Sequence, residues 1–413
     1  MVSGPVEVTP DALSARGQRR VLLVLCVTEI VSWGVLYYAF PVLAPAIAAD
    51  TGWSIPALTA GFSLGLVVSA VAGIPVGRWL DRFGPRRVMT TGSALALPAV
   101  QLVASAPSLP VFIAGWVLAG IAMAGTLYPP AFAALTRWWG PRRITALTGL
   151  TLAAGLSSTV FAPLTAALLG ALGWRHTYLV LAAVLTVLTI PAHLFGLRGP
   201  WPDPDPAERS AAGSARAPSA VARSRPFLLL AAALALGTFA AYAVLVNQVP
   251  LLIERGLTTT TAAWALGLGG LGQVLGRLGY GRLTRRLGVR SRSVVILSLS
   301  AAAIVLLAAL PGPPALLVAA ALLVGTTRGV FTLLQATAVS DRWGSAHYGR
   351  LNGLLSAPGL LVTALAPWAG AALAGVLGGY PAVFWLLAGI GAVAAVLALG
   401  SVPTPGGPGS TRR

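Results

Sequence analysis

Several classes of residue are scarce in this chain of 413 residues, and each scarcity excludes a class of protein. Charged residues make up 9% of the chain, whereas an average soluble domain contains about 25%. The single cysteine, Cys26, excludes an internal disulfide and a cysteine-based metal cluster, and the three histidines show no metal-ligand spacing. Hydrophobic residues, in contrast, make up 56% of the chain. The composition therefore predicts an integral membrane protein without a metal or another cofactor.

Signatures of catalysis are also missing from the sequence. It contains no nucleophile triad, no phosphate loop with a lysine and no ATP-binding domain. The string GLGGLG at residues 267–272 matches a dinucleotide-binding pattern, but no strand precedes it and it lies inside an apolar stretch. The small residues Gly272 and Gly276 suit close helix packing instead. We therefore expect neither an enzyme nor an ATP-driven pump.

Long apolar stretches follow one another along the whole chain. A membrane helix needs about 20 mostly apolar residues, and inside lipid each backbone amide must be bonded within its own segment. The sequence therefore predicts an all-α membrane protein with twelve spans, at residues 20–46, 57–77, 88–106, 110–134, 145–170, 176–197, 226–252, 262–281, 292–310, 314–340, 348–374 and 380–401.

The basic residues, all 28 of them arginine, are unevenly distributed between the connections. Both ends of the chain and one set of alternate connections carry nearly all of them, whereas the other set holds only Arg175 and Arg255. By the positive-inside rule this bias places both termini in the cytoplasm, in a bacterial-type inner membrane. The net charge of +18 is then a topology signal with some attraction to membrane lipid, and no nucleic-acid partner is expected.

The two halves of the chain are repeats of each other. A shift of 204 residues pairs Gly77 with Gly281, Arg82 with Arg286, Trp139 with Trp343, Gly155 with Gly359 and Pro163 with Pro367. Parallel repeats of this kind are a transporter plan in which the substrate binds between the halves. We expect a cytoplasmic tail at 1–19, a six-helix bundle at 20–197, a flexible cytoplasmic linker rich in Pro, Ala and Ser at 198–225, a second six-helix bundle at 226–402 and a tail at 403–413.

Three strings resemble those of a known family. The charged loop GRWLDRFGPRR at residues 77–87 resembles the loop motif between the second and third helices of the major facilitator superfamily. The strings YYAFPVLAPAIAADTGWS at 37–54 and GRLGYGRLTRR at 276–286 resemble bacterial relatives of monocarboxylate and oxalate/formate carriers. The resemblance implies two pseudo-symmetric bundles that alternate between inward and outward access, and a loop aspartate that latches the cytoplasmic side.

The residues of the charged loop suit such a latch. The arginines complement the negative end of the preceding helix, Asp81 accepts charge-assisted hydrogen bonds across the seam between halves, and the two glycines allow a tight turn and close approach. The alternative is a simple topology anchor. The second copy has Arg285 in place of Asp81, so we expect the halves to gate unequally. The predicted cytoplasmic gate consists of Gly77, Arg78, Asp81, Arg82, Gly84, Arg86 and Arg87.

Three ionisable residues fall inside predicted spans: Glu29, Arg277 and Arg328. Burying a charge there costs at least about 2.5–3.5 kcal/mol, so such residues are functional candidates. We expect Arg328, with or without Arg277, to bind a carboxylate through the guanidinium fork, and Glu29 to carry a proton because burial favours its neutral form. The resemblance implies the same role for Arg277, although Gln273 replaces the aspartate that accompanies it in those carriers. The alternatives are a structural pair between Glu29 and an arginine, and an Arg277 that extends to the membrane surface.

Further residues suit a cavity lined by the first, fourth, seventh and tenth helices, as the resemblance implies. Aromatic members could instead serve only as core. The candidates are Trp33, Tyr37, Tyr38, Tyr128, Tyr242, Asn247, Gln248 and Gln335.

We therefore predict a monomeric secondary transporter for a small organic anion, moved with or without a proton. One alternative is a proton-coupled exporter of hydrophobic compounds, although residues 155–170 lack the Gly-Pro rich motif usual in such exporters. A second alternative is a transporter-like membrane sensor that moves nothing.

Overall fold

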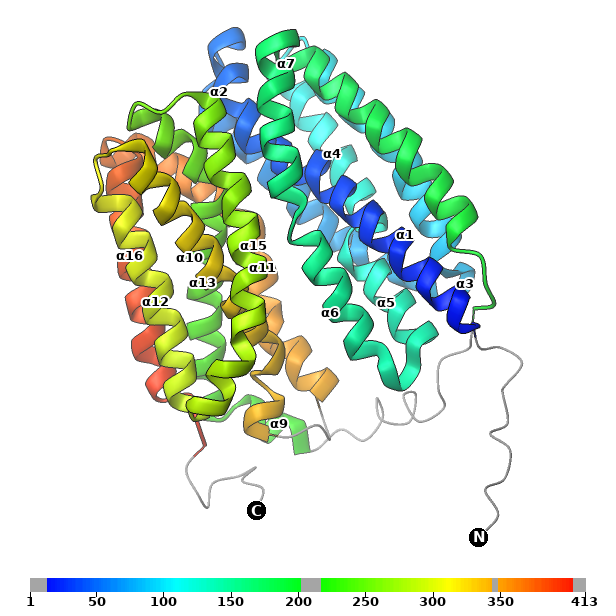
Figure 1. Ribbon diagram of the computed structural model, residues 1–413, viewed down its shortest axis with the longest axis vertical. Coiled ribbons are helices and arrows are strands. Elements are labelled where there is room, and N and C mark those ends of the chain that lie inside the picture. The colour runs from blue at the N-terminus through cyan, green and yellow to red at the C-terminus, as the bar shows by residue number, and fades with distance from the viewer. Residues whose placement is uncertain (1–12, 202–216, 344–347, 404–413) are drawn as a thin grey trace.

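The computed structural model describes residues 13–201, 217–343 and 348–403, and within these ranges all regular secondary structure is helical (Figure 1). The first half comprises α1 (Ala15–Trp33), η1 (Gly34–Tyr38), α2 (Ala39–Thr51), α3 (Ile55–Ser105), α4 (Leu109–Thr126), α5 (Tyr128–Trp139), η2 (Gly140–Arg142), α6 (Arg143–Ala154), α7 (Ser157–Pro191) and η3 (Ala192–Gly196). The second half comprises α9 (Ala217–Ala222), α10 (Arg225–Glu254), α11 (Thr259–Arg286), α12 (Val289–Ala309), α13 (Pro314–Thr337), α14 (Ser340–Trp343), α15 (Tyr348–Leu377) and α16 (Tyr380–Leu399).

The helix α3, and the continuous helical stretch Thr145–Gly196 that contains α7, are each long enough to cross a membrane twice. α3 has 51 residues, or about 77 Å at 1.5 Å per residue, against a hydrocarbon core of about 30 Å. It is broken at Gly84 (φ 74°, ψ 169°), and α7 is broken in the same way at Gly173 (φ 72°, ψ 169°). These left-handed conformations favour glycine because a Cβ atom would clash with the backbone.

Within the described ranges, nine helical stretches have the length and hydropathy of membrane spans. The stretches that contain α3 and α7 each provide a span on either side of the glycine break, and α11, with 28 residues, is long enough although less apolar. Counted in this way, the helices provide the twelve spans expected. The number of times the chain crosses a bilayer stays a prediction.

The end of one predicted span is corrected by the structure, and the predicted bounds of tails, bundles and linker stay predictions. The predicted span 57–77 continues past Gly77 to Phe83, because the chain leaves helical geometry only at Gly84. α1 begins at Ala15, inside the predicted tail 1–19, and the predicted linker 198–225 contains the short helix α9. Residues 1–12, 202–216 and 404–413 of the predicted tails and linker lie outside the described ranges.

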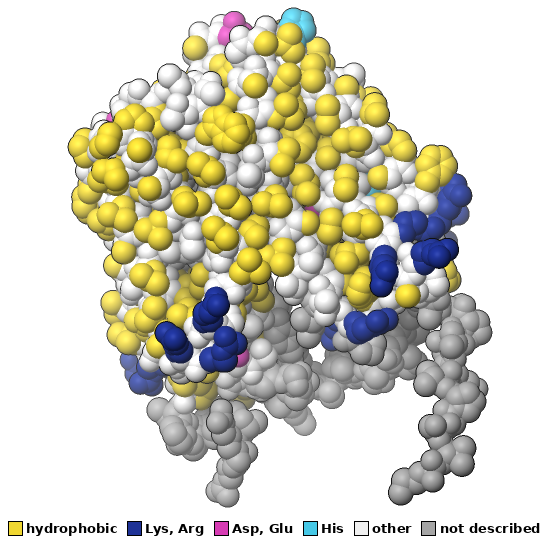
Figure 2. Space-filling view, in the orientation of Figure 1, with side chains coloured by type: hydrophobic (Ala, Val, Ile, Leu, Met, Phe, Trp, Pro, Cys, Tyr) yellow, Lys and Arg dark blue, Asp and Glu magenta, His cyan; other side chains and the backbone are white. Residues whose placement is uncertain are grey.

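The exposed arginines gather at one end of the molecule, which we call the arginine-rich end. α1 begins and α16 ends there, and Figure 2 shows basic side chains at this end of both halves. The opposite end carries few charged residues, among them Asp50, Arg175, Glu254 and Arg255. The arginine-rich end includes the exposed Arg16, Arg19, Arg20, Arg78, Arg82, Arg87, Arg282, Arg285, Arg286 and Arg290.

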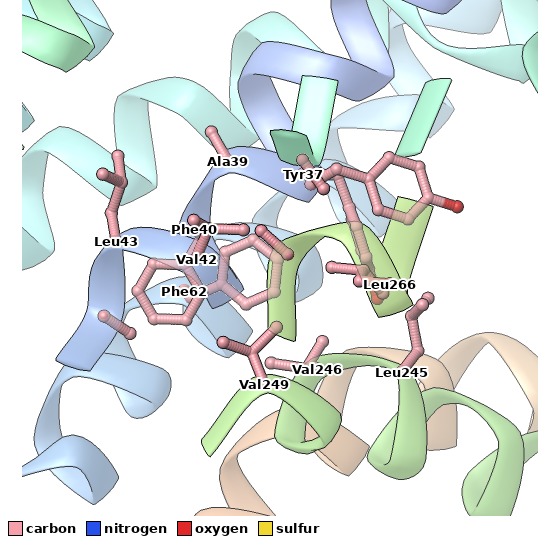
Figure 3. Close-up of a cluster of buried hydrophobic side chains, with 14 of the residues drawn as sticks. Tyr37, Ala39, Phe40, Val42, Leu43, Phe62, Leu245, Val246, Val249 and Leu266 are labelled. Carbon is pink, nitrogen blue, oxygen red and sulfur yellow. The ribbon is translucent and has the colours of Figure 1, made fainter. Parts of the chain in front are cut away.

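The two halves share a hydrophobic core at the opposite end only. Buried side chains of η1, α2 and α3 form one cluster with those of α10 and α11, and Figure 3 shows Phe40 and Phe62 from the first half close to Val246 and Val249 from the second. Toward the arginine-rich end each half has a separate core, one around Met89 and the other built from α10, α12, α13 and α16. The halves are therefore joined at one end and separate at the other.

Backbone contacts strengthen this junction. The Trp368 amide of α15 donates to Ser63 Oγ of α3 (3.2 Å), and Thr159 Oγ1 of α7 donates to the Gly267 carbonyl of α11 (2.8 Å). The glycine-rich string of α11 serves packing, as predicted. A Cβ atom on Gly272 would lie 2.3 Å from a carbonyl oxygen of α13, and one on Gly276 would lie 2.1 Å from another.

Candidate substrate cavity

A cavity with about 620 Å³ of empty space, part of it open, lies between the halves. Residues of η1, α5 and α6 line it from the first half, and residues of α10, α11 and α13 line it from the second. Its aromatic members are Trp33, Tyr37, Tyr38, Tyr128, Tyr242 and Phe331, and its polar members are Gln273, Arg277, Arg328, Thr332 and Gln335.

Arg328 lies on α13 and lines this cavity. One of its terminal nitrogens donates to the Gln273 amide oxygen on α11 (3.2 Å), and its Nε has no partner. Gln273 is neutral, and no carboxylate of the described residues forms an ion pair with Arg328. The guanidinium therefore brings a positive charge to the cavity that no neighbouring acid compensates.

Arg277 lies on α11, one turn after Gln273, and reaches across to the first half. Its guanidinium donates to the Thr151 carbonyl oxygen of α6, and the residue is only 8% exposed. Within the described ranges it also has no acidic partner. The side chain thus lines the cavity and does not extend to the membrane surface.

A short π-helical segment brings two adjacent tyrosines to the cavity. Neighbouring residues of a regular α-helix point about 100° apart, and a π-helical turn changes that spacing, often at functional sites. Here η1 places both Tyr37 and Tyr38 in the lining, with their rings 5.4 Å apart. The ring centre of Trp33 lies 5.3 Å from that of Tyr37 and 5.1 Å from that of Tyr128. The Tyr37 hydroxyl is buried and has no hydrogen-bond partner among the described residues.

Glu29 is fully buried on α1, one turn before Trp33. Neither carboxyl oxygen has a hydrogen-bond partner among the described residues. The Trp33 indole N–H also has no hydrogen-bond partner among the described residues. No arginine of the described ranges forms an ion pair with Glu29, so the alternative of a structural ion pair is not realised.

A second, wider space adjoins the cavity. Tyr242, Thr332 and Gln335 also line this space, whose other walls include Asn352 and Ser356 near the start of α15. Gln335 Nε2 donates to Thr238 Oγ1 (2.8 Å) at this junction. The two spaces therefore adjoin at Tyr242, Thr332 and Gln335, and the second lies between helices of the second half toward the arginine-rich end.

Two predicted cavity residues lie elsewhere. The Asn247 amide donates to the Ala243 carbonyl (2.8 Å) and to the Pro367 carbonyl of α15 (3.3 Å), so it joins helices. Gln248 is 3% exposed. Neither residue lines the cavity, because both lie in the part of α10 that belongs to the shared core.

Two polar lining residues were missed by sequence reasoning. Thr332 follows Arg328 by one helical turn, and Gln273 precedes Arg277 by one turn. Residues four apart share a helix face, so this spacing was the available signal.

The charged loop of residues 77–87 folds against its own half. Asp81 forms an ion pair with Arg137 at the end of α5, and not with a residue of the second half. The Trp201 indole donates to the Asp81 carbonyl (3.1 Å), and the Arg137 guanidinium lies 4.4 Å from the Trp201 ring centre. Gly84 packs beneath this ring, since a Cβ atom there would lie 3.3 Å from it.

The other predicted gate residues divide into two groups. Arg86 Nε donates to the Leu194 carbonyl of η3 (2.7 Å), whereas Arg78, Arg82 and Arg87 are exposed. A Cβ atom on Gly77 would meet nothing within 4 Å in this structure, and its role in a gate stays a prediction. The turn is made by Gly84 alone.

The second copy of the loop has exchanged its charges. With the shift of 204 residues, Asp81 corresponds to Arg285 and Arg137 corresponds to Asp341. Asp341 forms an ion pair with Arg292 of α12, and these side chains are 25% and 6% exposed. The second copy thus keeps an acidic residue, but at the position equivalent to Arg137 and not at the position equivalent to Asp81.

Comparisons with known proteins agree with this architecture. The family model described as Major Facilitator Superfamily matches residues 25–292 and 249–413. Monocarboxylate transporter 13 of Bos taurus is 28% identical over 87% of this chain and 83% of its own length. The oxalate:formate antiporter of Oxalobacter formigenes is 27% identical over 44% and 43%, and a chloramphenicol resistance protein of Streptomyces lividans is 31% identical over 64% and 67%.

A solved structure shows the same fold. It is the crystal structure of a bacterial homologue of the human lysosomal transporter Spinster, with a TM-score of 0.72 and 17% identity over 94% of this chain and 95% of that one. The family match covers most of the chain, and proteins of this family are carriers and not enzymes. The chain belongs to the Major Facilitator Superfamily.

Proposed function

We propose that this membrane transporter moves a small organic anion of the monocarboxylate type by alternating access. The observation that carries the proposal is the pair Arg277 and Arg328, which line one cavity between the halves without a carboxylate partner among the described residues. A guanidinium inside the membrane costs at least about 2.5–3.5 kcal/mol, and an anion in the cavity would offset that cost. The similarity to monocarboxylate and oxalate:formate carriers supports the same substrate class.

The lining favours a small acid with one carboxylate end. The forked guanidinium of Arg328 suits two parallel hydrogen bonds to a carboxylate, and Gln273 holds the fork from one side only. The rings of Trp33, Tyr37 and Tyr128 offer an apolar surface to the rest of such a molecule. The Tyr37 hydroxyl supplies a further polar contact.

The distribution of cores supports a rocking mechanism. A shared core at the opposite end closes that side, whereas the second space beyond Tyr242 and Gln335 lies toward the arginine-rich end. We place the arginine-rich end in the cytoplasm of the inner membrane because positively charged connections favour that side. The structure then represents the state that exchanges substrate with the cytoplasm, in a transporter that acts as a monomer.

Glu29 is our candidate for proton coupling. A buried carboxyl group without a hydrogen-bonding or ionic partner is held most easily in its neutral form. It lies one turn from Trp33, which lines the cavity, so a change in substrate occupancy can reach it through this ring. Its protonation would then accompany one of the two states of access.

A second candidate function is proton-coupled export of hydrophobic compounds. It is favoured by the similarity to the chloramphenicol resistance protein and by the aromatic lining. An exporter of that kind has no need for two unpaired arginines in its cavity, which is why we prefer the anion carrier.

Direct binding to the purified protein tests the proposal. Arg328→Gln removes the charge and the fork, and a charged hydrogen-bonded contact contributes about 1.5–3 kcal/mol, so we expect affinity for a monocarboxylate to fall about tenfold to a hundredfold. Arg282→Gln is the matched control, because Arg282 is an exposed arginine of the same half. Unchanged affinity in Arg328→Gln, or tight binding of uncharged drugs with no binding of carboxylates, would favour the exporter.

A further inference from the structure

A groove on the outer surface of the first half lies apart from the substrate cavity. It runs between the two arms of α3 and the adjacent α4, and we call it the α3–α4 groove. It holds about 950 Å³ of empty space, part of it open, and its walls include Val76, Trp79, Phe83, Arg87, Thr91 and Ile121. No aspartate or glutamate lines it.

The depth of the groove comes from two glycines. Gly92 of α3 and Gly125 of α4 meet backbone to backbone, since a Cβ atom on Gly92 would lie 3.0 Å from the Gly125 carbonyl carbon. The floor at this point is therefore formed by two glycine backbones, while Trp79 and Phe83 are 59% and 42% exposed on the wall. An apolar channel of this kind on a membrane-spanning surface suits a hydrocarbon chain.

The mouth of the groove at the arginine-rich end is positively charged. The guanidinium groups of Arg82 and Arg87 lie 5.1 Å and 5.8 Å from the Phe83 ring centre, and both residues are exposed. The neighbouring acid, Asp81, is engaged by Arg137. Neither Arg82 nor Arg87 forms an ion pair with any acid that the structure describes.

We propose that the α3–α4 groove is a binding site for an anionic phospholipid. One acyl chain lies in the groove along α4, and the phosphate group is held by Arg82 and Arg87, whose forked donors match phosphate oxygens. A free phosphate ion would leave the apolar channel unused. A zwitterionic lipid would bring a second, positive group to a mouth that already carries two arginines without an acid.

The second half provides a matched control. Arg286 occupies the position equivalent to Arg82, but the positions equivalent to Phe83 and Arg87 are Leu287 and Ser291. The ring and the second guanidinium that shape the mouth in the first half are therefore replaced there. Substitution of Arg286 removes the same charge from the same loop position without affecting the α3–α4 groove.

Native mass spectrometry of the full-length transporter in detergent tests this site with two probes of equal chain length, phosphatidylglycerol and phosphatidylcholine. We expect phosphatidylglycerol to bind about 25-fold more tightly than phosphatidylcholine, since each of the two arginines strengthens anionic lipid binding by roughly fivefold. The double variant Arg82→Gln/Arg87→Gln should lose this preference, and Arg286→Gln should retain it. Thr91→Trp fills the groove and keeps both arginines, so it should weaken binding of both lipids.

Three results would overturn the site. The first is an unchanged preference in Arg82→Gln/Arg87→Gln, and the second is an equal loss in Arg286→Gln, which would indicate general surface charge. The third is displacement of phosphatidylglycerol by inorganic phosphate at equal concentration, which would indicate an ion site without a lipid. A melting temperature equal to that of the parent protein shows that each variant is folded.

Discussion

The two halves of this transporter solve the same structural problems with different residues. At the arginine-rich end, the first half pairs Asp81 of α3 with Arg137 at the end of α5, whereas the second half pairs Asp341 of α14 with Arg292 of α12. The charges at the two equivalent positions have been exchanged. The comparison teaches that an acid–base pair at this junction is retained, while the element that supplies the acid differs.

Exposure differs between these two pairs. Asp81 is 64% exposed and lies one turn before the break of α3 at Gly84, so it can leave Arg137 and bind elsewhere when the halves move. Asp341 and Arg292 are 25% and 6% exposed, so they are held in place by their surroundings. The first pair suits a gate that opens and closes, and the second suits a fixed joint.

At the opposite end, the two halves also make equivalent contacts with arginines from different positions. Arg175 caps the last carbonyl groups of α3, at Ala104 (2.9 Å) and Ala106 (3.1 Å). Arg255 caps the end of α12 at the equivalent carbonyls, which belong to positions 308 (2.6 Å) and 310 (2.7 Å). These carbonyls lack helical partners in both halves, and arginines from non-equivalent positions satisfy them.

The segments that follow the last helix of each half are also held from equivalent positions. The Trp138 indole donates to the Pro200 carbonyl (2.7 Å), and Arg342 Nε donates to the Ser401 carbonyl (2.8 Å). Burial lowers the pKa of Arg342 to about 10, and it remains charged at neutral pH. Here too the contact is retained while its chemistry differs.

The largest difference expected from the comparison concerns Glu29, whose equivalent in the second half is the buried Ala233. If the acid of the first half carries the proton, Glu29→Gln should keep substrate exchange between two compartments but abolish accumulation driven by a pH gradient. Uptake into proteoliposomes with and without the gradient measures both. Gradient-driven accumulation that survives in Glu29→Gln would remove the proton role.

Asp341→Asn should mainly affect stability. It leaves the nearly buried Arg292 without its charge partner, and breaking a buried pair costs about 3–5 kcal/mol, which we reduce to about 2–3 kcal/mol because Asp341 is a quarter exposed. Equilibrium unfolding in detergent with a denaturant measures the loss. A loss below about 1 kcal/mol, the range of exposed pairs, would contradict the fixed joint.

Substitution of either capping arginine, Arg255 or Arg175, should lower the free energy of unfolding by a smaller amount. Arg255→Gln removes charged donors from two carbonyl groups of a partly buried site and should cost about 1–2 kcal/mol. Arg175→Gln should cost less, because its side chain is 40% exposed and water can replace it. Equal losses in the same unfolding assay would show that exposure does not distinguish the two caps.

The smallest stability effect is expected for Asp81→Asn. The pair with Arg137 is exposed, so its loss should cost less than about 1 kcal/mol, whereas transport should slow strongly because the gate loses its acid. The exchange Asp81→Arg with Arg137→Asp copies the charge order of the second half and should restore part of the rate. Normal transport by Asp81→Asn would show that the loop only anchors the chain.

The sequence predicts the fold class well because hydropathy, arginine distribution and the 204-residue repeat all act at the scale of whole helices. It also identifies Arg277, Arg328 and the tyrosines that line the cavity, since charged and polar residues inside spans are few. The end of the second predicted span was misplaced because Gly77 and Gly84 look alike in sequence, and only the backbone geometry distinguishes them.

Side-chain direction sets the limit of such prediction. Asn247 and Gln248 follow Tyr242 on the same helix, yet Tyr242 lines the cavity and Asn247 bonds to the backbone of α15. Which face of α10 meets the cavity depends on the packing of the other half. The acid that compensates for Arg285 in the second half, Asp341, cannot be predicted from identical residues of the repeat, because it occupies the position equivalent to an arginine.

Counterflow into proteoliposomes tests the central claim most directly. Vesicles loaded with an unlabelled monocarboxylate should take up the same labelled acid faster than empty vesicles, and Arg328→Gln should reduce this exchange to the level of protein-free vesicles. Exchange by Arg328→Gln at the rate of the parent protein would contradict an anion site between the halves.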